Sequence, residues 1–127
     1  MKEFDIIIIG GGLSGSSTAL NLSRKGYSVL IIEKEESGNM KPCAGGMASS
    51  MKKYLPLDID QSIESKIRNV EFRWKSSDNV VADLTGESPF WIIRREKLDK
   101  LLLDEAIKYG GETVSYTHLT LPTRLSV

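Results

Sequence analysis

Residues 4–15 read FDIIIIGGGLSG, and this stretch decides the fold. The four consecutive isoleucines form a β-branched run, which is typical of a strand buried on both faces of a parallel sheet. The glycines that follow end the strand and match the spacing G-x-G-x-x-G. From Ser14 to Lys25 the apolar residues fall on one helical face, and Gly26 stands where a C-terminal cap would lie. The stretch therefore predicts a strand, a glycine turn and a helix.

Residues 27–33, YSVLIIE, form a second apolar run that ends in an acid. A strand, a glycine turn, a helix and another strand within about thirty residues make a βαβ unit, whose crossover is expected to be right-handed. The predicted fold class is therefore α/β, and the chain begins as a Rossmann-like nucleotide-binding domain does.

The glycine turn has the pattern of a diphosphate site. Gly10 permits the tight turn, Gly12 leaves room for a pyrophosphate, and Gly15 lets the helix pack closely on the strand. The helix N-terminus then favours an anion. Glu33 ends the second strand, where its carboxylate can accept hydrogen bonds from ribose hydroxyls and would repel the extra phosphate of NADP. In a generic α/β protein it would be only a surface acid beside Lys34, and the residues alone leave NAD and FAD open.

The pattern changes after this unit to short strands and one further helix. Period-two alternation with turn residues between predicts an antiparallel hairpin, and apolar residues three and four apart predict the helix. The expected elements are a loop at 35–46, a short helix at 47–54, hairpin strands at 69–74 and 80–84, a strand at 90–93, and a helix from Leu98 to Gly110. The α/β unit should thus carry a small antiparallel β layer.

The composition excludes several classes of function. Hydrophobic residues make up 40% and charged residues 27% of the 127 residues, as in an ordinary globular domain. The formal net charge is zero, so no basic surface indicates a nucleic-acid partner. The one cysteine, Cys43, excludes an internal disulfide and favours a reducing compartment, so a cytoplasmic protein is expected. The apolar run at residues 6–9 is too short for a signal peptide or a membrane span.

Three motifs carry a resemblance to one enzyme family. Residues 5–34 are similar to the front of the FAD-dependent oxidoreductases related to p-hydroxybenzoate hydroxylase and glutathione reductase. Residues 41–47, KPCAGGM, resemble the K-P-C-x-G-G loop of the geranylgeranyl reductases, including archaeal digeranylgeranylglycerophospholipid reductases. Residues 91–99, WIIRREKLD, resemble their strand-to-helix signature, in which R-x-x-F/L-D follows hydrophobic residues. Leu98 stands where phenylalanine is frequent, and the family's later substrate-cavity motif is absent.

The resemblance implies FAD as the cofactor, held by an incomplete Rossmann-like FAD-binding domain. By matched position the cysteine loop lies beside the flavin. Arg95 fits the diphosphate or ribityl side, where a guanidinium forms charge-assisted bonds. Cys43 is the one candidate catalytic residue, because it could tune the flavin or position a double bond; the alternative is a small packed thiol. No metal site is expected. The expected cofactor contacts are Gly10, Gly12, Leu13, Ser14, Gly15, Glu33, Lys34, Cys43, Ala44, Gly46 and Arg95.

The activity that the resemblance implies is reduction of isoprenoid C=C bonds. The partners would be an isoprenoid or lipid substrate and an electron donor, NAD(P)H or ferredoxin, with peripheral membrane contact of the full-length protein. The same fold admits a flavin monooxygenase or halogenase, and an electron-transfer flavoprotein dehydrogenase; the fold does not decide among them, but the cysteine loop favours the reductase. Four aromatic residues would line an isoprenoid cavity or, more commonly for such alternation, belong to the core: Phe72, Trp74, Phe90 and Trp91.

The last residues of the chain are expected to have a different origin from the rest. Residues 114–123, VSYTHLTLPT, resemble codon by codon one reading frame through a transposon adapter used in preparing sequencing libraries. We therefore expect residues 1–113 to be a partial FAD-binding domain and residues 114–127 to be a non-native tail. Such a fragment alone is expected to be inactive.

Overall fold

The protein begins with the predicted βαβ unit. The computed structural model describes residues 2–34, 42–75, 78–84 and 89–115. Strand β1 (Ile6–Ile9) leads into helix α1 (Leu13–Ser23), and strand β2 (Val29–Glu33) then pairs with β1 in parallel, from Ile6 opposite Val29 to Ile9 opposite Ile32. Gly26 follows the helix with a positive φ of 88°. The α/β class and the order strand, turn, helix, strand are therefore confirmed.

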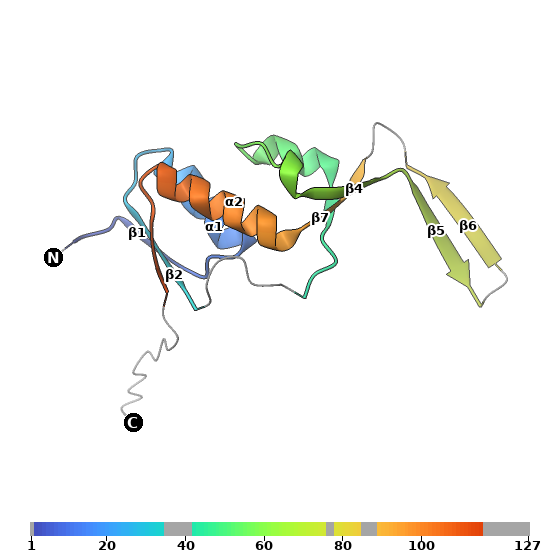
Figure 1. Ribbon diagram of the computed structural model, residues 1–127, viewed down its shortest axis with the longest axis horizontal. Coiled ribbons are helices and arrows are strands. Elements are labelled where there is room, and N and C mark those ends of the chain that lie inside the picture. Colours follow the sequence, from blue (N-terminus) through green and yellow to red (C-terminus); the bar gives the residue numbers. More distant parts are fainter. Residues whose placement is uncertain (1, 35–41, 76–77, 85–88, 116–127) are drawn as a thin grey trace, which may run out of the picture.

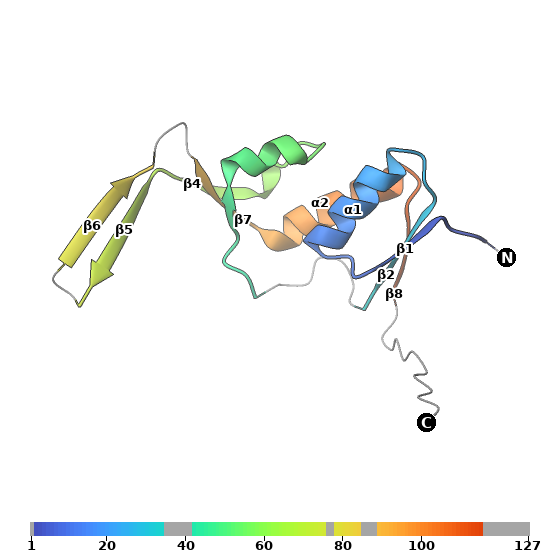
Figure 2. The ribbon, with the colours of Figure 1, turned by 180° about the vertical axis from the view of Figure 1, so that it is seen from behind.

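A third parallel strand extends this sheet on the other side of β2. Helix α2 (Arg95–Lys108) leads into strand β8 (Glu112–Ser115), which pairs with β2 and gives the order β1-β2-β8. Helices α1 and α2 lie side by side against the sheet (Figures 1 and 2). Their apolar faces pack on β2 to form the core, which contains Leu20 of α1, Val29 and Ile31 of β2, and Leu98 and Leu102 of α2.

The prediction that β1 is buried on both faces is wrong for the described residues. Ile7 and Ile9 are 58% and 69% exposed, whereas Ile6 and Ile8 are partly buried against the core. Side chains alternate between the faces of a strand, and α1 and α2 cover only the face that carries Ile6 and Ile8. A continuous apolar run indicates that a strand suits burial, but not which other element covers it.

A second, antiparallel sheet lies beyond the N-terminal end of α2. Its order is β3 (Gly46–Ala48), β7 (Phe90–Ile93) and β4 (Ile63–Ile67). Strand β7 is central and leads almost directly into α2 (Figure 1). Two short 3-10 helices, η1 (Ser49–Tyr54) and η2 (Asp60–Ser62), precede β4.

The short helix predicted at 47–54 is confirmed from Ser49 to Tyr54, where it is the 3-10 helix η1, whereas Met47 and Ala48 belong to β3. Strands β3 and β4 were not predicted. Both strands exist because β7 offers hydrogen bonds on its two edges, to Gly46–Ala48 and to Ile63–Ile67. This pairing joins residues far apart in the sequence, so local periodicity does not reveal it.

The predicted hairpin is confirmed, with one strand shifted by one to two residues. Strand β5 (Asn69–Trp74) pairs with β6 (Asp78–Asp83), and the hairpin projects from the rest of the molecule (Figure 1). Phe72 and Trp74 are exposed on it, so the expectation that they belong to the core is wrong. Trp91 of β7 is buried. Within the described residues no helix is long and apolar enough to cross a bilayer.

Candidate cofactor site

The glycine turn fastens the end of β1 to the end of β2. The Gly10 N–H donates to the Ile32 carbonyl oxygen at 2.8 Å. Gly10 has a φ of +98°, a left-handed conformation that favours glycine because a Cβ would clash with the backbone. The turn residue that the sequence singled out is therefore required by the backbone itself.

Helix α1 presents unused N–H groups to the space beside this turn. Its first helical bond runs from the Ser16 N–H to the Gly12 carbonyl at 2.8 Å, so the N–H groups of Leu13, Ser14 and Gly15 precede it and have no acceptor within the helix. Gly12 stands at the N-cap, and no described side chain caps the helix. A Cβ at Gly12 would meet no atom within 4 Å. Free donors, a positive helix end and open space together suit a phosphate group.

Gly15 has a different role from Gly12. A Cβ built on Gly15 would lie 1.8 Å from the Gly10 carbonyl oxygen and 3.3 Å from Ile8 Cγ2. Helix α1 therefore approaches the end of β1 as closely as a residue without a side chain allows. This contact holds the helix N-terminus over the turn, as the motif spacing predicts.

Glu33 lies beside the same turn. Its carboxylate accepts hydrogen bonds from the Gly11 N–H and, at 2.7 Å, from the N–H of Lys34. Glu33 is partly buried and Lys34 is exposed. Each carboxylate oxygen can accept more than one hydrogen bond. The structure thus brings the turn, the helix N-terminus and the acid together.

The cysteine loop is fixed to the end of β7. Gly45 has a φ of +75°, its carbonyl accepts the Ile93 N–H at 2.9 Å, and a Cβ on it would lie 2.0 Å from the Ile93 carbonyl oxygen. A Cβ at Gly46 would lie 2.7 Å from the Phe90 ring. Cys43 and Ala44 are exposed next to this anchor, whereas Lys41 of the motif lies outside the described residues.

Arg95 reaches the cysteine loop from the first turn of α2. Arg95 follows closely on the end of β7, to which Gly45 of the loop is bonded, and its guanidinium acts electrostatically on the Cys43 sulfur; that sulfur accepts the Gly45 N–H at 3.4 Å. The Gly45 N–H and, next, the Arg95 guanidinium hold the pKa of the Cys43 thiol below its usual range. The structure therefore brings together the cysteine loop and the start of α2, which belong to separate motifs in the sequence.

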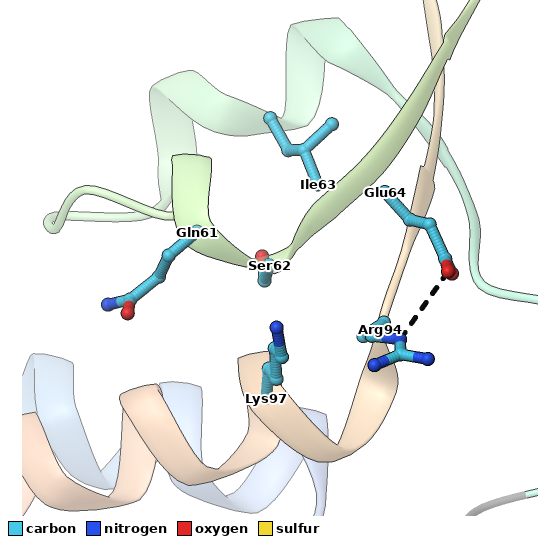
Figure 3. Close-up of a pocket in the computed structure, with 6 residues that line it drawn as sticks. All are labelled: Gln61, Ser62, Ile63, Glu64, Arg94 and Lys97. Carbon is cyan, nitrogen blue, oxygen red and sulfur yellow. Dashed lines mark ion pairs between the residues drawn. The ribbon is translucent and has the colours of Figure 1, made fainter.

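Arg94 points away from this contact. It pairs with Glu64 of β4 at 3.5 Å and lines a pocket of about 200 Å³ with Lys97 and Gln61 (Figure 3). The neighbouring residues Arg94 and Arg95 therefore have different ion-pair partners, Glu64 and Asp99.

One apolar pocket lies between the start of α1 and the region after the cysteine loop. It measures about 240 Å³ and is lined by Leu13, Ser14, Ser17, Met47, Met51, Tyr54 and Leu55. The residues that η1 and its flanks contribute were not predicted as site residues. Their spacing of three and four from Met47 onward was the available signal, since it places apolar side chains on one side of a helical turn. Among the described residues no group of three or more His, Cys, Asp or Glu could hold a metal ion.

Comparison with known proteins gives a consistent result. The family model described as FAD dependent oxidoreductase matches residues 5–88. The chain is 30% identical to digeranylgeranylglycerophospholipid reductase 2 of Methanothermobacter thermautotrophicus, over 89% of the chain and 30% of that protein. It is 31% identical to a probable electron transfer flavoprotein-quinone oxidoreductase, YgcN, of Escherichia coli, over 88% of the chain and 28% of that protein.

A solved structure has the same fold. The geranylgeranyl bacteriochlorophyll reductase-like protein of Thermoplasma acidophilum superposes with a TM-score of 0.76 at 23% identity, over 87% of this chain and 29% of that one. The chain thus spans less than a third of the length of the proteins it matches.

Proposed function

The chain belongs to the FAD-dependent oxidoreductase family. From this premise we propose that it is the first part of a reductase of isoprenoid carbon–carbon double bonds. The observation that carries the proposal is that the cysteine loop is bonded to the end of β7, through Gly45 and Ile93, just before Arg95, because the loop and Arg95 both belong to motifs of the geranylgeranyl reductases. The relative that is named a digeranylgeranylglycerophospholipid reductase supports the same substrate class. The proposed substrate is therefore an isoprenoid lipid or prenyl precursor.

The described residues fit the ADP half of FAD. The N–H groups of Leu13, Ser14 and Gly15 would bind the pyrophosphate, and the space at Gly12 would admit it without a steric clash. Glu33 would accept hydrogen bonds from the ribose hydroxyls, with Lys34 at the rim of the same site. These donors and acceptors converge on the end of the β1–α1 turn.

The other half of the cofactor would meet the cysteine loop. Cys43, Ala44 and Gly46 are exposed there, and Arg95 would contact the diphosphate or the ribityl chain. When bound and reduced, FAD supplies a hydride to one carbon of the double bond, while a proton is added to the other. The protein's share is to orient the cofactor and the substrate and to hold the Cys43 thiol at a fixed position.

The proposal also covers the partners and the extent of the chain. The electron donor would be NAD(P)H or ferredoxin, and the protein would be cytoplasmic with peripheral contact to a membrane. Residues 1–113 would be the first part of a longer enzyme, since the relatives extend well beyond the matched region, and residues 114–127 would be non-native. Genomic sequence across the codon for Thr113 tests this directly. Beyond Ser115 the tail lies outside the described residues.

The decisive assay uses the full-length protein. We expect it to purify yellow with FAD and, when reduced under anaerobic conditions, to add two hydrogens to each double bond of a geranylgeranyl lipid, as mass spectrometry can detect. A second candidate is favoured by the quinone oxidoreductase relative. Reduction of a ubiquinone analogue without any mass change of the lipid would support that candidate and reject the first.

Removing the Glu33 carboxylate should weaken FAD binding. Loss of a hydrogen bond to a charged group typically costs about 1.5–3 kcal/mol, so Glu33→Ala should lower the affinity by that amount. Glu33→Gln is the matched control, because it keeps one acceptor oxygen and should lose less. Titration calorimetry measures both; an unchanged affinity in the alanine variant would mean that Glu33 does not hold the ribose.

Replacing the Cys43 sulfur should affect turnover more than folding. Cys43 is exposed, so Cys43→Ser should change the free energy of unfolding by no more than about 0.5 kcal/mol. We expect lipid reduction to slow severalfold while FAD remains bound. Turnover equal to that of the wild type would leave the thiol without a role in the reaction.

A further inference from the structure

Helix α2 contains one ion pair that differs from the others on it. Arg95 Nε donates to Asp99 Oδ1 at 3.1 Å, and Arg95 Nη2 donates to Asp99 Oδ2 at 3.2 Å. Two parallel bonds between a guanidinium and a carboxylate fix both the distance and the plane of the guanidinium. A single bond to a lysine would leave the cation free to rotate.

This ion pair is largely removed from water. The Asp99 side chain is 8% exposed and that of Arg95 is 21% exposed. The pair Lys100–Asp104, with the same spacing on the same helix, is 59% and 48% exposed. An exposed pair of that kind contributes little, whereas a buried carboxylate is costly unless it is paired. Asp99 lies on the apolar side of the helix beside Leu98 and Leu102, so its burial has to be compensated by Arg95.

The Arg95–Asp99 pair lies next to the cysteine loop, so its position affects Cys43. The Gly45 carbonyl of the cysteine loop accepts the Ile93 N–H at 2.9 Å, so the loop lies against the chain just before Arg95. The guanidinium that Asp99 holds also acts electrostatically on the exposed Cys43 thiol, as the Asp99 charge does with the opposite sign.

We propose that Asp99 is the positioning residue of the cofactor site, because its two bonds hold the Arg95 guanidinium against the Cys43 thiol. The inference rests on the proposed function, in which Arg95 and Cys43 contact the cofactor. The side-chain bonds of Asp99 go to Arg95, so it would act through Arg95.

The test measures how fast iodoacetamide alkylates Cys43 in the full-length protein across a pH series, with the labelled peptide quantified by mass spectrometry. The thiolate is the reacting form, so the midpoint of the pH profile reports on the thiol and its neighbours. In Asp99→Asn the guanidinium loses its bidentate partner. We expect the midpoint to rise and alkylation near neutral pH to slow severalfold.

A merely electrostatic role of Asp99 gives the opposite sign. The Asp99 charge by itself raises the pKa of Cys43. If Arg95 stayed in place without its partner, removal of that charge would lower the midpoint. A lower or unchanged midpoint in folded Asp99→Asn protein therefore overturns the inference. Asp104→Asn, which breaks the exposed pair on the same helix, is the matched control and should leave the profile unchanged.

Two further variants keep the test decisive if Asp99→Asn folds poorly. Asp99→Glu keeps the charge but displaces the guanidinium, so the midpoint should rise by less. In an Arg95→Lys background, Asp99→Glu should add no further shift, because the two residues act in series; an additive shift would contradict the inference. The profile is measured with and without bound FAD, because a flavin placed against Cys43 would shield the thiol. A shifted midpoint in a protein that binds no FAD would leave the positioning role intact and reject the proposed function.

Discussion

Gly15→Ala should be among the most damaging single substitutions in the chain. Its new Cβ would lie 1.8 Å from the Gly10 carbonyl oxygen, far inside van der Waals contact. That oxygen is a backbone atom, so no side-chain rotation can relieve the clash. Helix α1 would have to move away from β1, so its N-terminal N–H groups would leave the turn. Overpacking of this kind costs about 1–3 kcal/mol, and we expect a loss near 3 kcal/mol in urea unfolding together with loss of FAD binding.

Gly12→Ala provides the control for this prediction. No atom lies within 4 Å of a Cβ at Gly12, and its φ of −70° is accessible to alanine. Loss of the preferred N-cap glycine should cost no more than about 1 kcal/mol. FAD affinity should nevertheless fall, because the methyl group would occupy the space proposed for the pyrophosphate. If the two variants were equally stable, the close packing of Gly15 would not matter to the fold.

Gly45→Ala should separate the cysteine loop from β7. The substitution combines a φ of +75° with a Cβ 2.0 Å from the Ile93 carbonyl oxygen. A left-handed residue with a Cβ costs about 1–2 kcal/mol, and the steric clash adds to it, so we expect a total loss of about 3 kcal/mol. Hydrogen exchange of the Ile93 amide, which donates to Gly45, should accelerate.

Gly110→Ala separates the two contributions to that loss. Gly110 has a similar φ of +95°, but a Cβ there would meet no atom within 4 Å. Its alanine variant should therefore show only the conformational cost, and Ile93 exchange should not change. Equal losses of stability in the two variants would contradict a steric role for Gly45.

The sequence predicted the nucleotide-binding unit well because its determinants are local. An apolar strand, a glycine turn and an amphipathic helix lie within one short stretch, and the parallel pairing of β1 with β2 follows from them. The position of Glu33 beside the turn also follows, since the ends of adjacent parallel strands lie together. Strands β3 and β4 could not be predicted in the same way, because their order depends on pairing with β7.

The candidate site was predictable only in part. The motifs indicated Cys43 and Arg95 separately, and their resemblance to one family placed both near the flavin; the structure adds that the cysteine loop is bonded to the strand that leads into Arg95. Asp99 was visible as the last letter of R-x-x-L-D, but its burial was not, because an acid in a helix is usually solvated. The spacing of four residues from Arg95 was the one signal that pointed to an ion pair.

The projecting hairpin has a consequence for how such proteins can diverge. Strands β5 and β6 form a two-stranded sheet, and within the described part of the chain they pair only with each other. Residues inserted or deleted in pairs between Lys75 and Asp78 would preserve which side chains share a face, because the strand repeat is two. A single residue inserted between Ile93 and Arg95 would rotate the start of α2 and carry Arg95 away from Cys43. Lineages can therefore vary the length of the hairpin freely, whereas the junction of β7 and α2 must keep its length.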